Sequence, residues 1–83
     1  MKVLKIYSET CGPCKVLEKN LQAAGISHEN VDVDSEQGEE LVSKYKVRGI
    51  PTLLLVNDKG HVINRYTGVM NVEELKDFVN ETN

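Results

Sequence analysis

The sequence predicts an α/β fold in which three helices flank a four-stranded mixed sheet, in the order βαβαββα. Short apolar runs typical of buried strands alternate with segments whose apolar residues recur at helical spacing. The first strand–helix–strand unit requires a parallel strand pair. The turn sequence NDKG at residues 57–60 instead indicates an antiparallel hairpin near the C-terminus. With 83 residues, the chain is expected to form one domain over residues 1–83.

The first 25 residues supply a strand and a helix. Residues 2–7 form a mostly apolar run, interrupted by Lys5, that is typical of a buried strand. A helix is predicted from residue 12 or 13 to about residue 24, because Leu17 and Leu21 recur at helical spacing. Gly25 supplies a C-terminal stop for this helix.

The middle of the chain supplies a second strand and a second helix. Val31 and Val33 alternate with polar residues, which suggests a short strand. Asp34 is followed three positions later by Gln37, a spacing typical of a capping pair, so the helix is expected to begin there. The apolar residues that this helix would bury are Leu41, Val42 and Tyr45.

The last third of the chain completes the sheet. The almost wholly apolar run at residues 51–56 predicts an internal strand, and residues 61–66 are its expected hairpin partner. Asn71 and Glu74 have the spacing of a capping box, which predicts a final helix. The apolar stripe of that helix comprises Val72, Leu75, Phe78 and Val79.

Composition and charge exclude several classes of partner. The net charge is −3, and the Lys and Arg residues are scattered, without the basic stripe that a nucleic acid backbone requires. The N-terminal apolar run is too short for a secretory signal, and nothing approaches the length of a membrane span. We therefore expect a cytoplasmic protein with no nucleic acid or membrane partner. In the reducing cytosol, two close cysteines are more typical of catalysis or metal binding than of a structural disulfide.

The motif CGPC at residues 11–14 lies at the predicted junction between the first strand and the first helix. Only the thiolate attacks a disulfide, and a free cysteine has a pKa of about 8.5. Unpaired N–H groups and the macrodipole at a helix start stabilise negative charge, so Cys11 is placed to ionise. Pro13 suits the first helical turn. Cys14 returns to the same side of the helix, where it can attack a mixed disulfide made by Cys11.

Other interpretations of the cysteine pair compete with thiol–disulfide exchange. A zinc site would need four ligands, and the two histidines could complete it. Neither histidine has a ligand-like spacing, however, and both are expected to be exposed surface residues. A structural disulfide would close too short a loop to stabilise the fold much. We therefore predict exchange chemistry and no metal site; the four candidate zinc ligands are Cys11, Cys14, His28 and His61.

A second motif, RGIPT at residues 48–52, places Pro51 at the start of an apolar strand, where proline is tolerated. If the Ile50–Pro51 bond were cis, the backbone would bend and expose polar groups of Ile50. An extended substrate segment could pair with those groups beside the thiols. Most X–Pro bonds in folded proteins are trans, so the residues alone leave the isomer open.

Together, CGPCK at residues 11–15, VRGIPTLLL at residues 47–55, Gly60 and Gly68 closely resemble the thioredoxin family over nearly the whole chain. The resemblance implies a thioredoxin fold without the extra N-terminal strand and helix of full-length thioredoxins. It implies that Cys11 is the exposed nucleophile, Cys14 the buried resolving thiol and Pro51 a cis proline facing them. The substrate-binding residues that it suggests are Thr10, Gly12, Pro13, Ile50, Pro51, Thr67 and Gly68.

The resemblance also implies an activity and partners. The chain would be a monomeric enzyme that reduces protein disulfides with no bound cofactor, its redox centre being the Cys11–Cys14 disulfide. Electrons would come from an NADPH-dependent flavoprotein of the thioredoxin reductase type. A glutaredoxin-like, glutathione-dependent reductase is the alternative, although the Gly-Gly-plus-Asp glutathione site of that family is not present at residues 66–71. A non-catalytic redox or zinc-binding module is a second alternative.

The sequence departs from the family pattern near the cysteines. Thioredoxins usually have a tryptophan before the first cysteine, where this chain has Thr10. They place a buried aspartate six residues before that cysteine, where this chain has Lys5. We expect the Lys5 ammonium to reach water; alternatively it lies near the thiols and, with Lys15, lowers their pKa. Proton transfer to or from Cys14 must then use water or another group.

Overall fold

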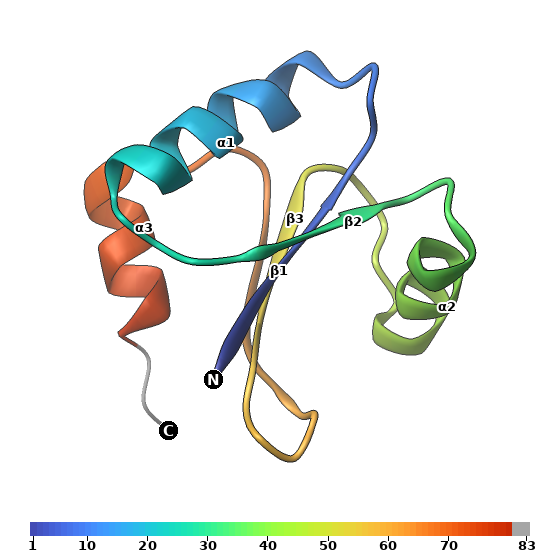
Figure 1. Ribbon diagram of the computed structural model, residues 1–83. Coiled ribbons are helices and arrows are strands. Elements are labelled where there is room, and N and C mark those ends of the chain that lie inside the picture. The colour runs from blue at the N-terminus through green and yellow to red at the C-terminus, as the bar shows by residue number, and fades with distance from the viewer. Residues whose placement is uncertain (81–83) are drawn as a thin grey trace.

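The chain folds into a sheet with helices on both faces, described here from a computed structural model for residues 1–80 (Figure 1). In the sheet, the strands lie in the order β2-β1-β3-β4. Figure 1 shows α1 and α3 on one side of the sheet and α2 on the other. The elements are β1 (Lys2–Tyr7), α1 (Gly12–Ala23), β2 (Glu29–Asp32), α2 (Glu36–Tyr45), β3 (Thr52–Val56), β4 (Val62–Thr67) and α3 (Val72–Val79).

The sheet is mixed, as the sequence predicts. β1 pairs in parallel with β2, across the α1 crossover, and antiparallel with β3. β3 and β4 form the predicted antiparallel hairpin, with a register irregularity between Leu55 and Val56. β1 and β3 are therefore the two central strands, and each contains a run of consecutive buried residues.

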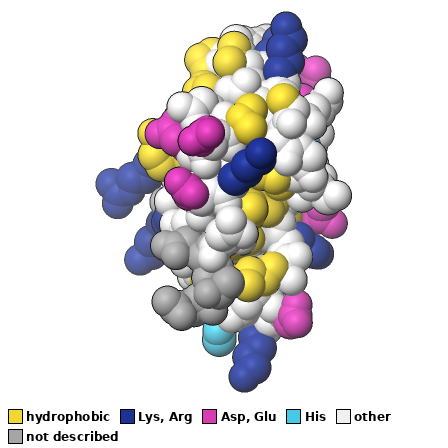
Figure 2. Space-filling model, turned by 90° about the vertical axis from the view of Figure 1, so that its left-hand side faces the viewer, with side chains coloured by type: hydrophobic (Ala, Val, Ile, Leu, Met, Phe, Trp, Pro, Cys, Tyr) yellow, Lys and Arg dark blue, Asp and Glu magenta, His cyan; other side chains and the backbone are white. Residues whose placement is uncertain are grey.

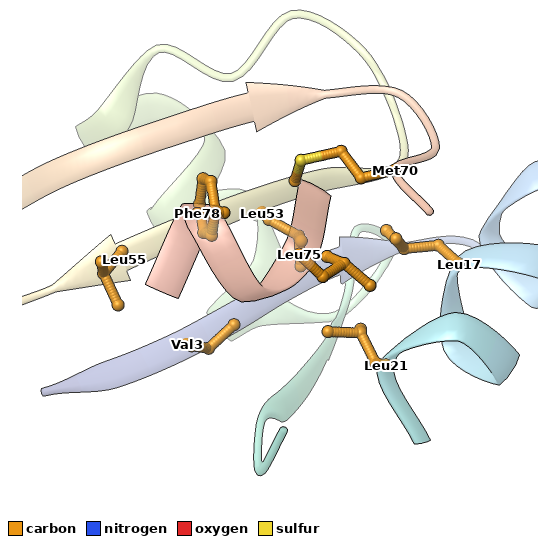
Figure 3. Close-up of a cluster of buried hydrophobic side chains, with 8 residues drawn as sticks. All are labelled: Val3, Leu17, Leu21, Leu53, Leu55, Met70, Leu75 and Phe78. Carbon is orange, nitrogen blue, oxygen red and sulfur yellow. The ribbon is translucent and has the colours of Figure 1, made fainter. Parts of the chain in front are cut away.

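Side-chain alternation along the central strands divides the hydrophobic core in two. Val3, Leu53 and Leu55 face α1 and α3, where they pack with residues of both helices (Figure 3). The residues contributed from the helices and the segment before α3 are Leu17, Leu21, Met70, Leu75 and Phe78. Leu4 and Leu54 face the opposite way and form a second core with Ile6, Val31, Val47 and Val56.

The start of α2 differs from the prediction. Its N-cap is Ser35, whose Oγ accepts a hydrogen bond from the Gly38 N–H at 2.9 Å, so the expected Asp34–Gln37 pair is not the cap. Asp34 instead belongs to the preceding turn, where its N–H donates to Asp32 Oδ1. The predicted apolar residues of α2 do pack against the second core, although they stay partly exposed: Leu41, Val42 and Tyr45.

α3 has the predicted capping box, in which Asn71 Oδ1 accepts from the Glu74 N–H and the Glu74 carboxylate accepts from the Asn71 N–H.

Acidic, basic and apolar side chains are interspersed on the face that α1 and α3 cover (Figure 2). This mixture agrees with the scattered charges of the sequence. Among residues 1–80, no helix combines the length and apolarity needed to cross a bilayer.

Candidate active site

The two cysteines lie where β1 passes into α1. Cys11 is the N-cap of α1, with extended backbone angles (φ −90°, ψ 110°), and its Sγ accepts a hydrogen bond from the Cys14 N–H at 3.1 Å. The Cys11 sulfur therefore sits at the positive end of the helix, as the sequence predicts. Cys11 is partly exposed, Cys14 is 2% exposed, and the two form a disulfide with their Cα atoms 5.3 Å apart. Cys11 is therefore the more accessible residue of the pair, and Cys14 is the buried one.

The strand register brings the RGIPT motif to the same end of the sheet. Thr52, the first residue of β3, pairs with Ile6 near the end of β1 and with Thr67 at the end of β4. The Ile50–Pro51 peptide bond is cis, as the family resemblance implies. The Gly68 N–H donates to the Pro51 carbonyl at 2.9 Å, which joins this turn to the end of β4.

A buried threonine holds these loops together. Thr52 is fully buried, and its Oγ1 donates a hydrogen bond to the Gly49 carbonyl at 2.6 Å. The same Oγ1 is also hydrogen-bonded to Thr67 Oγ1 at 2.8 Å. Apolar side chains border the same end of the sheet and are substantially exposed, Ile50 and Val69 each by 37%. Of the residues expected to bind substrate, Pro51 alone is buried; those that stay exposed or partly exposed are Thr10, Gly12, Pro13, Ile50, Thr67 and Gly68.

The structure corrects the expectation that Lys5 reaches water. Lys5 is 3% exposed, and its Nζ lies 2.5 Å from Glu18 Oε1 and 5.2 Å from the centre of the Tyr7 ring. β1 places Lys5 on the same face as Val3, beneath α1, where a four-carbon stem cannot pass the helix to solvent. A carboxylate from that helix meets the ammonium instead. Lys15, the other residue expected to tune the thiols, is exposed.

His28 is also not the exposed residue that the sequence suggests. Its side chain is 8% exposed, with Nε2 2.8 Å from Glu18 Oε1 and Nδ1 3.1 Å from the Ile26 carbonyl oxygen. His61 is exposed, as expected. Glu18 thus joins β1 to the segment before β2, and sequence reasoning missed it. Its signal was its position four residues after Cys14, on the same face of α1.

Glu18 carries a charge that its neighbours stabilise. Burial alone would raise the pKa of the Glu18 carboxyl, but hydrogen bonds from Lys5, His28 and Gln22 lower that pKa from 4.5 to about 2. Partial burial and the Glu9 carboxylate raise the pKa of Tyr7, so its phenol is neutral near pH 7. An open pocket of about 340 Å³ extends over this cluster; Lys5, Glu18 and Cys14 are among the residues that line it.

The polar cluster is not arranged as a metal site. Within residues 1–80, no three or more His, Cys, Asp and Glu side chains are grouped so that they could hold a metal ion. Cys11 and Cys14 form a disulfide with each other, and His28 is hydrogen-bonded to Glu18. The chemistry available here is that of a dithiol and its disulfide.

The mixed sheet, the disulfide at the start of α1 and the cis proline at the same end of the sheet define a thioredoxin-fold dithiol protein. Residues 1–81 match the family model described as Thioredoxin. A chain from Bacillus subtilis (strain 168), the SPbeta prophage-derived thioredoxin-like protein YosR, is 34% identical over 68 residues, which are 82% of each chain. This chain belongs to the thioredoxin family.

Other relatives agree with this assignment. A thioredoxin of Bacillus subtilis (strain 168) is 39% identical over 79 residues, covering 90% of this chain and 75% of that one. The structure of a mutant thioredoxin from Halobacterium salinarum superposes with a TM-score of 0.79 at 32% identity, covering 98% of this chain and 74% of that one. The protein is therefore a thiol–disulfide oxidoreductase whose redox centre is the Cys11–Cys14 disulfide. These matches do not favour the glutathione-dependent alternative.

Proposed function

We propose that this protein reduces disulfides of protein substrates, with Cys11 as the nucleophile and Cys14 as the resolving thiol. The observation that carries the proposal is the position of Cys11 Sγ, partly exposed and accepting a backbone N–H at the start of α1. Partial positive charge there favours the thiolate. The burial of Cys14 keeps the second sulfur away from substrate until a mixed disulfide forms beside it.

The electrons balance in two steps. The Cys11 thiolate attacks one sulfur of the substrate disulfide; that bond breaks, and the departing substrate sulfur leaves with the electron pair and takes a proton from water. Cys14, having lost its proton, then attacks Cys11 Sγ and displaces the second substrate sulfur. The protein ends as the Cys11–Cys14 disulfide, and the substrate has gained two electrons and two protons.

We assign the docking of substrate to the loops at this end of the sheet. An extended segment would pair with the backbone next to Pro51 and contact the exposed side chains of Ile50 and Val69. Thr67 and Gly68 would border the same groove, because the Gly68 N–H is bonded to the Pro51 carbonyl. Thr10, Gly12 and Pro13 would form its opposite wall, and the exposed Lys15 would add positive potential there.

The proposal extends to the partners and the setting of the reaction. We assign residues 1–83 to one monomeric, cytoplasmic domain that needs no bound cofactor, nucleic acid or membrane. Electrons would come from an NADPH-dependent flavoprotein reductase of the thioredoxin reductase type. Comparing reduction of the oxidised protein by such a reductase with NADPH and by glutathione tests the donor. Faster reduction by glutathione than by the reductase would reject this part of the proposal.

Reduction of insulin in the presence of dithiothreitol tests the reaction. Cys11→Ser should abolish catalysis, and Cys14→Ser should accumulate mixed disulfides with substrate, detectable by mass spectrometry. Ala23→Ser, at the exposed far end of the same helix, is the matched control and should keep full activity. Equal activity in the parent and in both cysteine variants would reject the mechanism.

A further inference from the structure

Lys5 is a buried cation that the proposed reaction does not yet use. It lies in the middle of a central strand, and a lysine this deeply buried is rarely retained without a charged partner. Its partner is Glu18, whose side chain is 26% exposed. An ammonium group has three donors, and the Glu18 carboxylate engages one of them. The remaining N–H groups are available to the pocket that Lys5 lines.

Cys14 lines the same pocket as this ion pair. Glu18 follows Cys14 by four residues in α1, so the two side chains are neighbours on one face of the helix. Helical side chains lean toward the N-terminus, which carries the Glu18 carboxylate, and the Lys5 ammonium bonded to it, back over the turn that holds Cys14. Lys5, which is buried, and Glu18, which is partly buried, are therefore the shielded charges that share this pocket with the resolving cysteine.

His28 contacts the Glu18 carboxylate from the segment before β2. Its Nδ1 faces the Ile26 carbonyl and its Nε2 faces the Glu18 carboxylate, both of which are acceptors. The ring thus contacts the same carboxylate oxygen that meets the Lys5 ammonium. A carboxylate bonded in this way is a weak proton acceptor, because its pKa is about 2.

We propose that the Lys5 ammonium stabilises the thiolate form of Cys14 electrostatically, and that Glu18 is the positioning residue that holds the ammonium beside the pocket. Burial disfavours the Cys14 thiolate, and a nearby cation offsets that cost. The cation takes no proton from Cys14: the proton leaves to water in the open pocket. The thiolate then attacks Cys11 Sγ, and the bond from Cys11 to the substrate sulfur breaks, as in the proposed function on which this inference rests.

The other polar groups around the pocket are less able to supply this charge. Glu9, Lys15 and Lys19 are exposed, so water and salt screen them. Tyr7 is neutral near pH 7, and Asn30, from β2, carries no charge. The titratable or charged side chains that line the pocket, apart from Cys14, are Lys5, Tyr7, Glu9, Lys15, Glu18 and Lys19.

The test is an equilibrium titration of Cys14 in the Cys11→Ser protein, followed by the ultraviolet absorbance of the thiolate. Adding Lys5→Met should raise the measured Cys14 pKa by about one unit, so the thiolate fraction below that pKa falls about ten-fold. Lys5→Gln removes the cation but keeps a hydrogen-bond donor for Glu18, and it should raise the Cys14 pKa by a similar amount. This variant serves as the test if Lys5→Met does not fold. Lys2→Met is the matched control, because Lys2 is an exposed lysine of the same strand paired with Glu29 at 3.7 Å, and it should leave the Cys14 pKa unchanged.

Glu18→Gln tests the positioning role through a double-mutant cycle. If Glu18 acts by holding Lys5, Glu18→Gln should shift the Cys14 pKa further upward in the protein that keeps Lys5 than in the Lys5→Met variant. Equal shifts in the two backgrounds would show that Glu18 does not act through Lys5.

A Cys14 pKa that is unchanged or lower in both neutral Lys5 variants would overturn the inference. This titration involves no turnover, so its failure in a protein that still reduces insulin would leave the proposed function intact. An inactive parent would instead reject the proposed function.

Discussion

Glu18 accepts hydrogen bonds from side chains that reach it from three parts of the chain. Lys5 comes from β1, His28 from the segment before β2, and Gln22 from the next turn of α1, where its Nε2 lies 2.9 Å from Glu18 Oε2. Each of these bonds requires an ionised carboxylate or is strengthened by one. The protonation state of one side chain therefore affects the packing of α1 onto the sheet.

This arrangement predicts a specific loss of stability in acid. The pKa of Glu18 is about 2 in the folded protein and has an ordinary value of 4.5. The folded-state pKa is the lower one, so the stability that Glu18 contributes is present above pH 4.5 and is lost as the pH falls from about 4.5 to about 2. In urea denaturation at a series of pH values, Glu18→Gln should lose less free energy of unfolding over this range than the parent does.

The control for this measurement is Glu29→Gln, which neutralises a carboxylate in an exposed ion pair. Because exposed pairs contribute little, this variant should follow the parent curve. Identical pH dependence in the parent and in Glu18→Gln would contradict the assignment of the low pKa to Glu18.

Lys5 and His28, whose burial sequence reasoning missed, both contact a partner that lies far along the chain. Cys11 and Cys14 could be placed at the start of a helix because strand, proline and helix follow one another locally. The environment of Lys5 depends on Glu18, thirteen residues away, and that of His28 depends on the same carboxylate. Local patterns suggest that a lysine or histidine prefers water, whereas a buried partner reverses that preference.

At the scale of elements, α2 lies against the end of β2 through a glycine. Gly38 is the one buried residue of α2. A Cβ built at this position would lie 1.9 Å from the Asp32 carbonyl oxygen, which belongs to the backbone of β2. Neither the helix nor the strand end can retreat without breaking the Ser35 cap, whose Oγ donates to the same carbonyl at 2.6 Å.

Gly38→Ala should therefore destabilise the protein by about 1–3 kcal/mol, the usual cost of forcing extra atoms into a packed site. This sign is opposite to the general preference for alanine inside helices, which favours Ala over Gly by roughly 0.5–1 kcal/mol. The measurement is the free energy of unfolding from urea denaturation. Ser43→Ala, an exposed position of the same helix, is the control and should be neutral or stabilising. A stabilised Gly38→Ala protein would show that α2 does not approach β2 this closely.

The start of α2 shows where element prediction reaches its limit. Asp34 and Ser35 are both good cap residues, and the spacing of Asp34 to Gln37 made the first the better candidate. The choice is made by Asp32, which engages the Asp34 N–H through its side chain and the Ser35 hydroxyl through its carbonyl. By contrast, Asn71 has no such competitor and forms the predicted box with Glu74.

Across the whole molecule, the order of elements and two strand pairings, β1 with β2 and β3 with β4, could be predicted because each follows from a strong local signal. The NDKG turn indicates the hairpin, the first strand–helix–strand unit indicates the parallel pair, and the apolar run of β3 indicates a strand buried on both faces. The residues of β3 are all buried, and they alternate between the two cores. One strand thus joins the packing of α1 and α3 to the packing of α2.

This sharing predicts that the two faces of the sheet unfold together. Leu53→Ala empties a site in the core under α1 and α3, and Leu54→Ala empties one in the core under α2; both leucines are fully buried. Each substitution should cost about 2–5 kcal/mol, a large share of the roughly 5–15 kcal/mol that stabilises a typical domain. Val16→Ala, at an apolar position that is 50% exposed, should change stability by no more than about 0.5 kcal/mol.

Native-state hydrogen exchange distinguishes joint from separate unfolding. If β3 couples the two cores, Leu54→Ala lowers the protection of slowly exchanging amides in α1 as much as in α2, although its side chain contacts only the α2 side. Leu53→Ala gives the reciprocal result. A loss of protection confined to α2 in Leu54→Ala would mean that the two layers open independently. The turn at Pro51 and the end of β4 at Thr67 would then be held by one layer only, and the proposed substrate groove could open without unfolding α1.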